Sequence, residues 1–212
     1  MNHVFIVTYG RSGSTLLQAV LNSIDGYKIV GENYHALLHL YRSCRSIRRS
    51  YNDWGKISPV RGWLGASDFS PYDYETEIAQ LFTRQVMRPT EDTRVAGFKE
   101  IRWGDCSDEE FFDILRFIER RFHGTKFVFN SRDAEEVAKS SWWRNTAPAK
   151  VHAYVSRMDS LFGRACDENP ASRYSVNFNR YLSDPSELAG MFAFLNEPFD
   201  HETIKRVLAI RV

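Results

Sequence analysis

The stretch VFIVTYGRSGSTLLQAVL, residues 4–21, decides the fold of this chain. Its first four residues are β-branched or aromatic, as in a buried strand, and apolar residues return at helical spacing from Leu16 onward. Between them, Gly10 and Gly13 let the backbone come close to a ligand. The N–H groups at the start of the helix point into the same loop, and Arg11 adds a positive charge. The pattern therefore predicts a strand, an anion-binding loop and a helix.

The kind of anion depends on a residue that the loop lacks. A nucleoside-triphosphate loop reads GxxxxGK[ST], with a Lys that reaches the outer phosphates and a hydroxyl that binds Mg²⁺. Ser14 stands at the position of that Lys, and the cation of this loop, Arg11, precedes Gly13. The loop therefore argues against a kinase or an ATPase, although a P-loop kinase with an altered loop stays an alternative. Another alternative is a tight turn whose hydroxyls only cap the helix.

The motif RSGST, residues 11–15, resembles the 5′-phosphosulfate loop of sulfotransferases, which bind 3′-phosphoadenosine 5′-phosphosulfate (PAPS). A second motif supports the resemblance, because Arg132 ends a buried strand and Ser140 follows eight residues later, two turns into the next expected helix. In that family an Arg and a Ser at this spacing hold the 3′-phosphate, for which a forked guanidinium and a hydroxyl are suitable donors. The resemblance implies that the cofactor-binding residues are Arg11, Ser12, Gly13, Ser14, Thr15, Arg132 and Ser140.

The C-terminal part of the chain follows the family pattern with two departures. A strand, the dipeptide DP at 184–185, a helix and FLNEP at 194–198 match the family's order. Phe178 and Asn179 stand where Tyr and Glu are usual. Many members also bind the 3′-phosphate through a basic, Gly-containing loop near the C-terminus, and here Arg211 or a lid arginine would have to replace it. The departures bear on cofactor affinity and support an alternative, a non-catalytic nucleotide-binding module of the same fold.

Alternating strand and helix patterns predict an α/β fold. Beyond residues 4–21, we expect strands at 27–30, 94–98, 127–129 and 173–178, and helices at 35–49, 75–87, 108–122, 149–167 and 186–195. Together they indicate a P-loop-like three-layer sandwich, with a mainly parallel central sheet of four or five strands and helices on both faces. The length suits a single sulfotransferase-like domain over residues 1–212.

Residues 50–74 lack a sustained period but are rich in aromatic side chains. A long irregular segment inside a domain is usually functional or disordered, and the aromatic content argues against disorder. We expect a lid or acceptor-binding loop here. Its aromatic residues, which could stack on a sugar or pack into the core, are Trp54, Trp63, Phe69 and Tyr72.

Two residues compete for the role of general base. Glu32 follows the strand at 27–30, at the edge of the sheet where open α/β folds bind ligands. The resemblance to bacterial carbohydrate sulfotransferases, which use a glutamate after this strand, favours Glu32, and His35 is its rival. Arg11 would neutralise charge on the leaving phosphate oxygen, and Lys99 could lie along the transferring sulfonate. The catalytic candidates are therefore Glu32, Arg11, Lys99 and His35, and no metal is expected.

These features predict a sulfotransferase that moves the sulfuryl group of PAPS to an acceptor hydroxyl and leaves 3′,5′-adenosine bisphosphate. The aromatic segment and the carboxylate base favour a carbohydrate or glycoconjugate acceptor. A net charge of +1 gives no global field for nucleic acid or an anionic membrane. The three scattered cysteines suggest a reducing compartment, and no apolar run approaches the roughly 20 residues of a membrane span. If Met1 is native, we expect a cytoplasmic protein; the sequence leaves a homodimer open.

Overall fold

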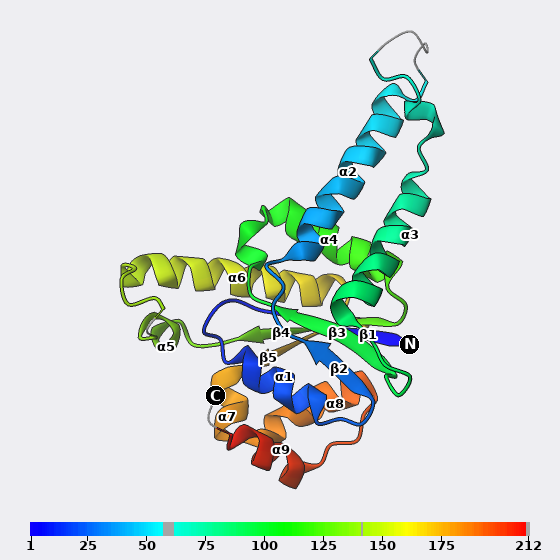
Figure 1. The fold of residues 1–212 in the computed structure, drawn as a ribbon. Coiled ribbons are helices and arrows are strands. Elements are labelled where there is room, and N and C mark those ends of the chain that lie inside the picture. Colours follow the sequence, from blue (N-terminus) through cyan, green and yellow to red (C-terminus); the bar gives the residue numbers. More distant parts are fainter. Residues whose placement is uncertain (57–61, 141, 211–212) are drawn as a thin grey trace.

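A computed structural model describes residues 1–56, 62–140 and 142–210 of the chain. In it, five parallel strands form one sheet in the order β2-β3-β1-β4-β5 (Figure 1). The strands are β1 (Asn2–Val7), β2 (Tyr27–Val30), β3 (Val95–Glu100), β4 (Thr125–Ser131) and β5 (Arg173–Asn177). The α/β three-layer sandwich predicted from the sequence is confirmed.

Two layers of helices cover the sheet, and the central strand shows why. Phe5 and Val7 of β1 pack into one apolar cluster, while Val4 and Ile6 pack into the other, because successive side chains of a strand point to opposite faces. The first cluster lies under α2 (Ala36–Trp54), α3 (Pro71–Phe82), α4 (Asp108–Arg121), α5 (Ala134–Ala138) and α6 (Pro148–Glu168). The second lies under α1 (Ser14–Asn22), α7 (Phe178–Ser183), α8 (Ala189–Leu195) and α9 (His201–Leu208).

The helices α2 and α3 enclose less irregular chain than the sequence predicts. α2 runs on to Trp54, and α3 begins at Pro71, four residues before the expected start. Pro at the first helical position and the Ser70 side chain, which accepts from the Asp73 N–H, begin α3. The two helices extend together away from the sheet (Figure 1). Residues 57–61 of the expected lid lie outside the described residues.

The second half of the chain departs from expectation at three helices. α5 ends at Ala138, so Ser140 lies in the turn that follows and not two turns into a helix. α7 begins at Phe178, where the sequence predicted strand, because the Asn177 side chain caps it by accepting from the Arg180 N–H. α9 was not predicted, although Asp200 caps it through two N–H groups. No helix in the described ranges has the length and apolar character that a bilayer crossing needs.

Candidate functional site

The loop between β1 and α1 is built around two glycines that aromatic rings approach. Gly13 adopts a φ of +78°, and a Cβ there would lie 2.1 Å from Cδ2 of Phe178. A Cβ at Gly10 would lie 2.3 Å from Cζ3 of Trp142. Only glycine combines the left-handed backbone of the first position with such close packing. The two glycines therefore make room for aromatic rings, and the binding of an anion by this loop stays a prediction.

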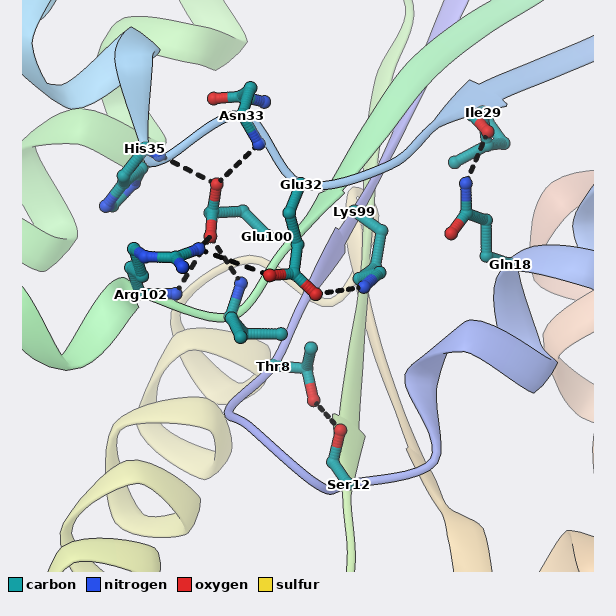
Figure 2. Close-up of polar contacts among 11 residues, drawn as sticks. Thr8, Ser12, Gln18, Ile29, Glu32, Asn33, His35, Lys99, Glu100 and Arg102 are labelled. Carbon is teal, nitrogen blue, oxygen red and sulfur yellow. Dashed lines mark hydrogen bonds and ion pairs between the residues drawn. The ribbon is translucent and has the colours of Figure 1, made fainter. Parts of the chain in front are cut away.

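Hydrogen bonds to strand β4 hold the loop in place. Asn130 Nδ2 donates to the Ser12 carbonyl at 2.9 Å, and the Tyr181 hydroxyl donates to Asn130 Oδ1 at 3.0 Å. The Thr8 hydroxyl lies 2.6 Å from the Ser12 hydroxyl and 2.7 Å from the Asn130 carbonyl oxygen (Figure 2 shows the Thr8–Ser12 contact). All four residues are buried. The Ser12 hydroxyl thus stabilises the loop from inside and does not face a ligand.

Arg132 joins the end of β4 to the same loop. Its Nη1 donates to the Arg11 carbonyl at 3.1 Å, and its guanidinium lies 4.8 Å from the centroid of the Phe178 ring. Its Nε is buried and has no hydrogen-bond partner among the described residues, and the same holds for Oγ of Ser140. Buried polar groups are normally hydrogen-bonded, so each of these two atoms lacks the partner that such a group usually has.

Tyr9 fixes the backbone at Arg132. The Arg132 N–H donates to the Tyr9 hydroxyl at 2.8 Å, and that hydroxyl lies 3.1 Å from Oδ1 of Asp159. Burial raises the pKa of Asp159 to about 6. A tyrosine of the anion loop therefore connects the turn after β4 to helix α6.

A cavity of about 450 Å³ lies over the loop and joins both sequence motifs. It brings together the predicted residues Arg11, Gly13, Ser14, Thr15, Glu32, Lys99 and Arg132. Its remaining wall is mostly apolar and consists of Leu16, Ile101, Trp142, Phe178, Leu182, Leu208, Ala209 and Ile210. Ser12, His35, Ser140 and the described part of residues 50–74 do not line it. Arg211, a possible substitute for the basic C-terminal loop, lies outside the described residues.

A larger cavity, about 630 Å³, lies on another side of the molecule and has a structural explanation. It is lined by arginines of α2, and Arg42 and Arg48 pair there with the carboxylates of Glu110 and Glu75 at 2.7 and 2.5 Å. Both carboxylates are buried. The basic face of α2 thus binds carboxylates of α3 and α4.

Glu32 and Lys99 meet at the carboxyl ends of β2 and β3 (Figure 2). Lys99 Nζ lies 2.6 Å from Oε1 of Glu32, and Arg102 Nη1 lies 3.2 Å from Oε2. The Lys99 side chain is 6% exposed and that of Glu32 is 34% exposed. Because β3 separates β2 from β1, Lys99 lies between the candidate base and the strand that leads into the loop. The parallel sheet therefore places a carboxylate and two cations at the edge formed by the carboxyl ends of its strands.

Glu100 organises this edge and was missed in the sequence. Its buried carboxylate accepts from the N–H groups of Asn33 (3.1 Å), His35 (2.8 Å), Ile101 (2.8 Å) and Arg102 (3.1 Å), and from Arg102 Nη1 at 3.2 Å (Figure 2). Burial alone would raise the pKa of Glu100, but these donors outweigh it and hold the pKa below its usual range. The available sequence signal was a Glu directly after Lys99 in a buried strand.

His35 is buried and does not line the cavity. Its side chain is buried, and its ring packs edge-on against Trp103 with centroids 4.6 Å apart. Burial lowers the pKa of His35 to about 4, so the imidazole is neutral at pH 7. Neither ring nitrogen has a partner within the described ranges. Of the two candidate bases, the structure brings Glu32 and not His35 to the cavity.

In the described part of the chain, no group of His, Cys, Asp and Glu is arranged to hold a metal ion.

The sequence was also compared with known proteins and protein families. A search of curated proteins finds no match. A family model described as "Sulfotransferase family" matches residues 3–201, which include the loop, Glu32 and Arg132. The chain therefore belongs to the sulfotransferase family.

Proposed function

We propose that the protein transfers the sulfuryl group of PAPS to a hydroxyl of a carbohydrate or glycoconjugate. Family membership supports the reaction type. The observation that carries the proposal is the single cavity in which the anion loop, Arg132 and the Glu32–Lys99 pair meet. This arrangement supports adjoining positions for a nucleotide donor, a transferring group and a base.

The residues present fit the donor. Arg11, Ser14, Thr15 and the N–H groups at the start of α1 would hold the 5′-phosphosulfate, because a helix N-terminus favours an anion. Arg132, which lines the cavity, would hold the 3′-phosphate. Ser140 does not line the cavity, but its buried hydroxyl has no partner among the described residues, which supports it as a second donor. The apolar wall offers flat contacts to the adenine ring.

PAPS, when bound, supplies an activated sulfuryl group. The protein's residues position the reacting groups and neutralise the charge that develops on them. Arg11 and the loop N–H groups stabilise negative charge on the leaving phosphate oxygen. Glu32 accepts the proton of the acceptor hydroxyl. Lys99 and Arg102 bind one oxygen each of Glu32, and every carboxylate oxygen has two acceptor sites, so the base stays able to accept a proton while it is held in place.

Substitutions at the two ends of the cavity test the proposal. Arg11→Ala and Arg132→Ala each remove charged hydrogen bonds, so we expect 3′,5′-adenosine bisphosphate to bind about 10- to 100-fold more weakly in calorimetry. Arg49→Ala, at a side chain 85% exposed on α2, is the matched control and should bind normally. Glu32→Gln should keep donor binding and lose transfer of labelled sulfate from PAPS.

Two outcomes would change the assignment. Retained turnover in Glu32→Gln would exclude Glu32 as the base. Bisphosphate binding by the unaltered protein without transfer to any acceptor would favour the non-catalytic nucleotide-binding module.

A further inference from the structure

Tyr34 is exposed and strained next to the candidate base. Tyr34 lies two positions after Glu32, and the residue is 78% exposed. Tyr34 and His35 both have a positive φ, 55° and 54°. Residues other than glycine rarely adopt this conformation, which costs free energy, and an exposed ring recovers little of it through burial. Such an outlier points to a use for the ring.

The strained turn is fixed from beneath by Glu100. One oxygen of this fully buried carboxylate accepts from the N–H groups of Asn33 and His35, the residues on either side of Tyr34. Figure 2 shows the two bonds converging on that oxygen. The position of the Tyr34 backbone is therefore determined by the core of the protein, although its ring lies in solvent.

Arg102 connects the ring to the base. Its guanidinium lies 4.2 Å from the centroid of the Tyr34 ring, and its Nη1 lies 3.2 Å from Oε2 of Glu32 and 3.2 Å from Oε1 of Glu100. A guanidinium at this distance is attracted to the face of the ring. One face of Tyr34 thus contacts Arg102, and the high exposure leaves the other face open to solvent, two residues from Glu32, which lines the cavity.

We propose that Tyr34 and Arg102 form a sugar-binding acceptor subsite, in which the open face of Tyr34 stacks on the apolar face of a pyranose ring. The inference rests on the proposed function, since the bound sugar would present a hydroxyl to Glu32. A sugar fits better than an aryl acceptor. An aryl ring gains from an enclosing apolar pocket, whereas the surroundings of Tyr34 are charged and open to water, where sugar hydroxyls stay hydrated.

The test measures sugar binding directly, so that it does not depend on turnover. Saturation-transfer NMR would use the protein with 3′,5′-adenosine bisphosphate and a panel of oligosaccharides of hexoses, N-acetylhexosamines and uronic acids, with p-nitrophenol as the aryl probe. We expect Tyr34→Ala to weaken sugar binding by about 2- to 10-fold and Tyr34→Phe to retain sugar binding. Leu81→Ala removes an exposed apolar side chain of α3 and should change nothing.

A stability measurement separates a binding role from a structural one. Tyr34→Gly relieves the left-handed strain, so its melting temperature should be unchanged or higher while sugar binding falls. The proposal is overturned if no sugar of the panel binds, or if Tyr34→Ala binds the sugar as the unaltered protein does. It is also overturned if Tyr72→Ala loses sugar binding and Tyr34→Ala does not. Sulfate transfer to p-nitrophenol without sugar binding would overturn the subsite and leave sulfuryl transfer intact, so the two failures are distinguishable.

Discussion

At the scale of single residues, Glu100 decides how the site is arranged. Five N–H groups converge on its carboxylate, two of them from the turn that carries Glu32 and Tyr34. Burial disfavours the charged form, yet the donors win and the pKa falls below its usual range. The charge is therefore part of the folded state, and its loss would release the turn that carries Glu32, the proposed base, and Tyr34.

Glu100→Gln should change how stability depends on pH. A carboxyl whose folded pKa lies below its ordinary 4.5 stabilises the fold above that pH and loses the contribution as the pH falls further. We expect the variant to have a free energy of unfolding lower by about 1 to 3 kcal/mol at pH 7 than the unaltered protein. This gap between the two proteins should narrow below pH 4.5. Urea unfolding between pH 3.5 and 7 measures this, with Glu187→Gln as an exposed control. A gap that stays constant over the range would contradict the prediction.

Sequence motifs predicted the residues whose roles are local and missed those whose roles are tertiary. Arg11, Lys99 and Arg132 reach the cavity because a strand end or a loop places them there. Glu100 and Tyr34 owe their positions to the approach of the β2 end to the β3 end, a contact between residues far apart in sequence. No spacing along the chain encodes such a contact.

At the scale of elements, strands were predicted more accurately than helix ends. Buried runs of β-branched and aromatic residues define the strands, since these residues suit a sheet covered on both faces. Helix ends depend on single capping groups: Ser70 and Asp200 begin helices that the sequence pattern alone did not reveal there. The early end of α5 leaves Ser140 in a turn, so its spacing from Arg132 is not the helical one that was expected.

The contact between the loop and Trp142 gives a prediction at this scale. A Cβ at Gly10 would lie within 2.9 Å of three atoms of the ring of Trp142, a residue 56% exposed, so the ring would have to move. Gly10→Ala should therefore remove this part of the cavity wall and weaken bisphosphate binding as much as Trp142→Ala does. The double variant should be no weaker than either single one, a coupling that calorimetry detects.

Gly163→Ala is the matched control for that cycle. Gly163 lies within α6, and an added Cβ would meet nothing within 4 Å apart from its chain neighbours and the backbone of its own helix. Alanine should therefore leave binding unchanged and stabilise the helix by about 0.5 to 1 kcal/mol. Additive losses in the Gly10 and Trp142 double variant would mean that the two residues act on the ligand independently.

At the scale of the whole molecule, the parallel sheet gathers residues from distant parts of the chain at one edge. The order β2-β3-β1-β4-β5 sets β1 between β3, which ends in Lys99 and Glu100, and β4, which leads to Arg132. Ligands of open α/β sheets bind at this edge. The sequence predicted this edge from the strand ends of an open α/β sheet, whereas the apolar wall from α7 and α9 depends on packing that only the structure reveals.

Ligand binding at this edge should stabilise the whole fold. A ligand that binds only the folded state adds about 2.7 kcal/mol at one hundred times its dissociation constant, which in a domain of this size raises the melting temperature by about 5 to 10 °C. We expect this shift with 3′,5′-adenosine bisphosphate and none with ATP–Mg²⁺, because Ser14 replaces the Lys of a triphosphate loop. Thermal unfolding with each nucleotide measures it, and Arg132→Ala, with its weaker binding, should lose about half to most of the shift at the same ligand concentration. Stabilisation by ATP–Mg²⁺ alone would favour a kinase, and no shift with either nucleotide would exclude PAPS as the donor.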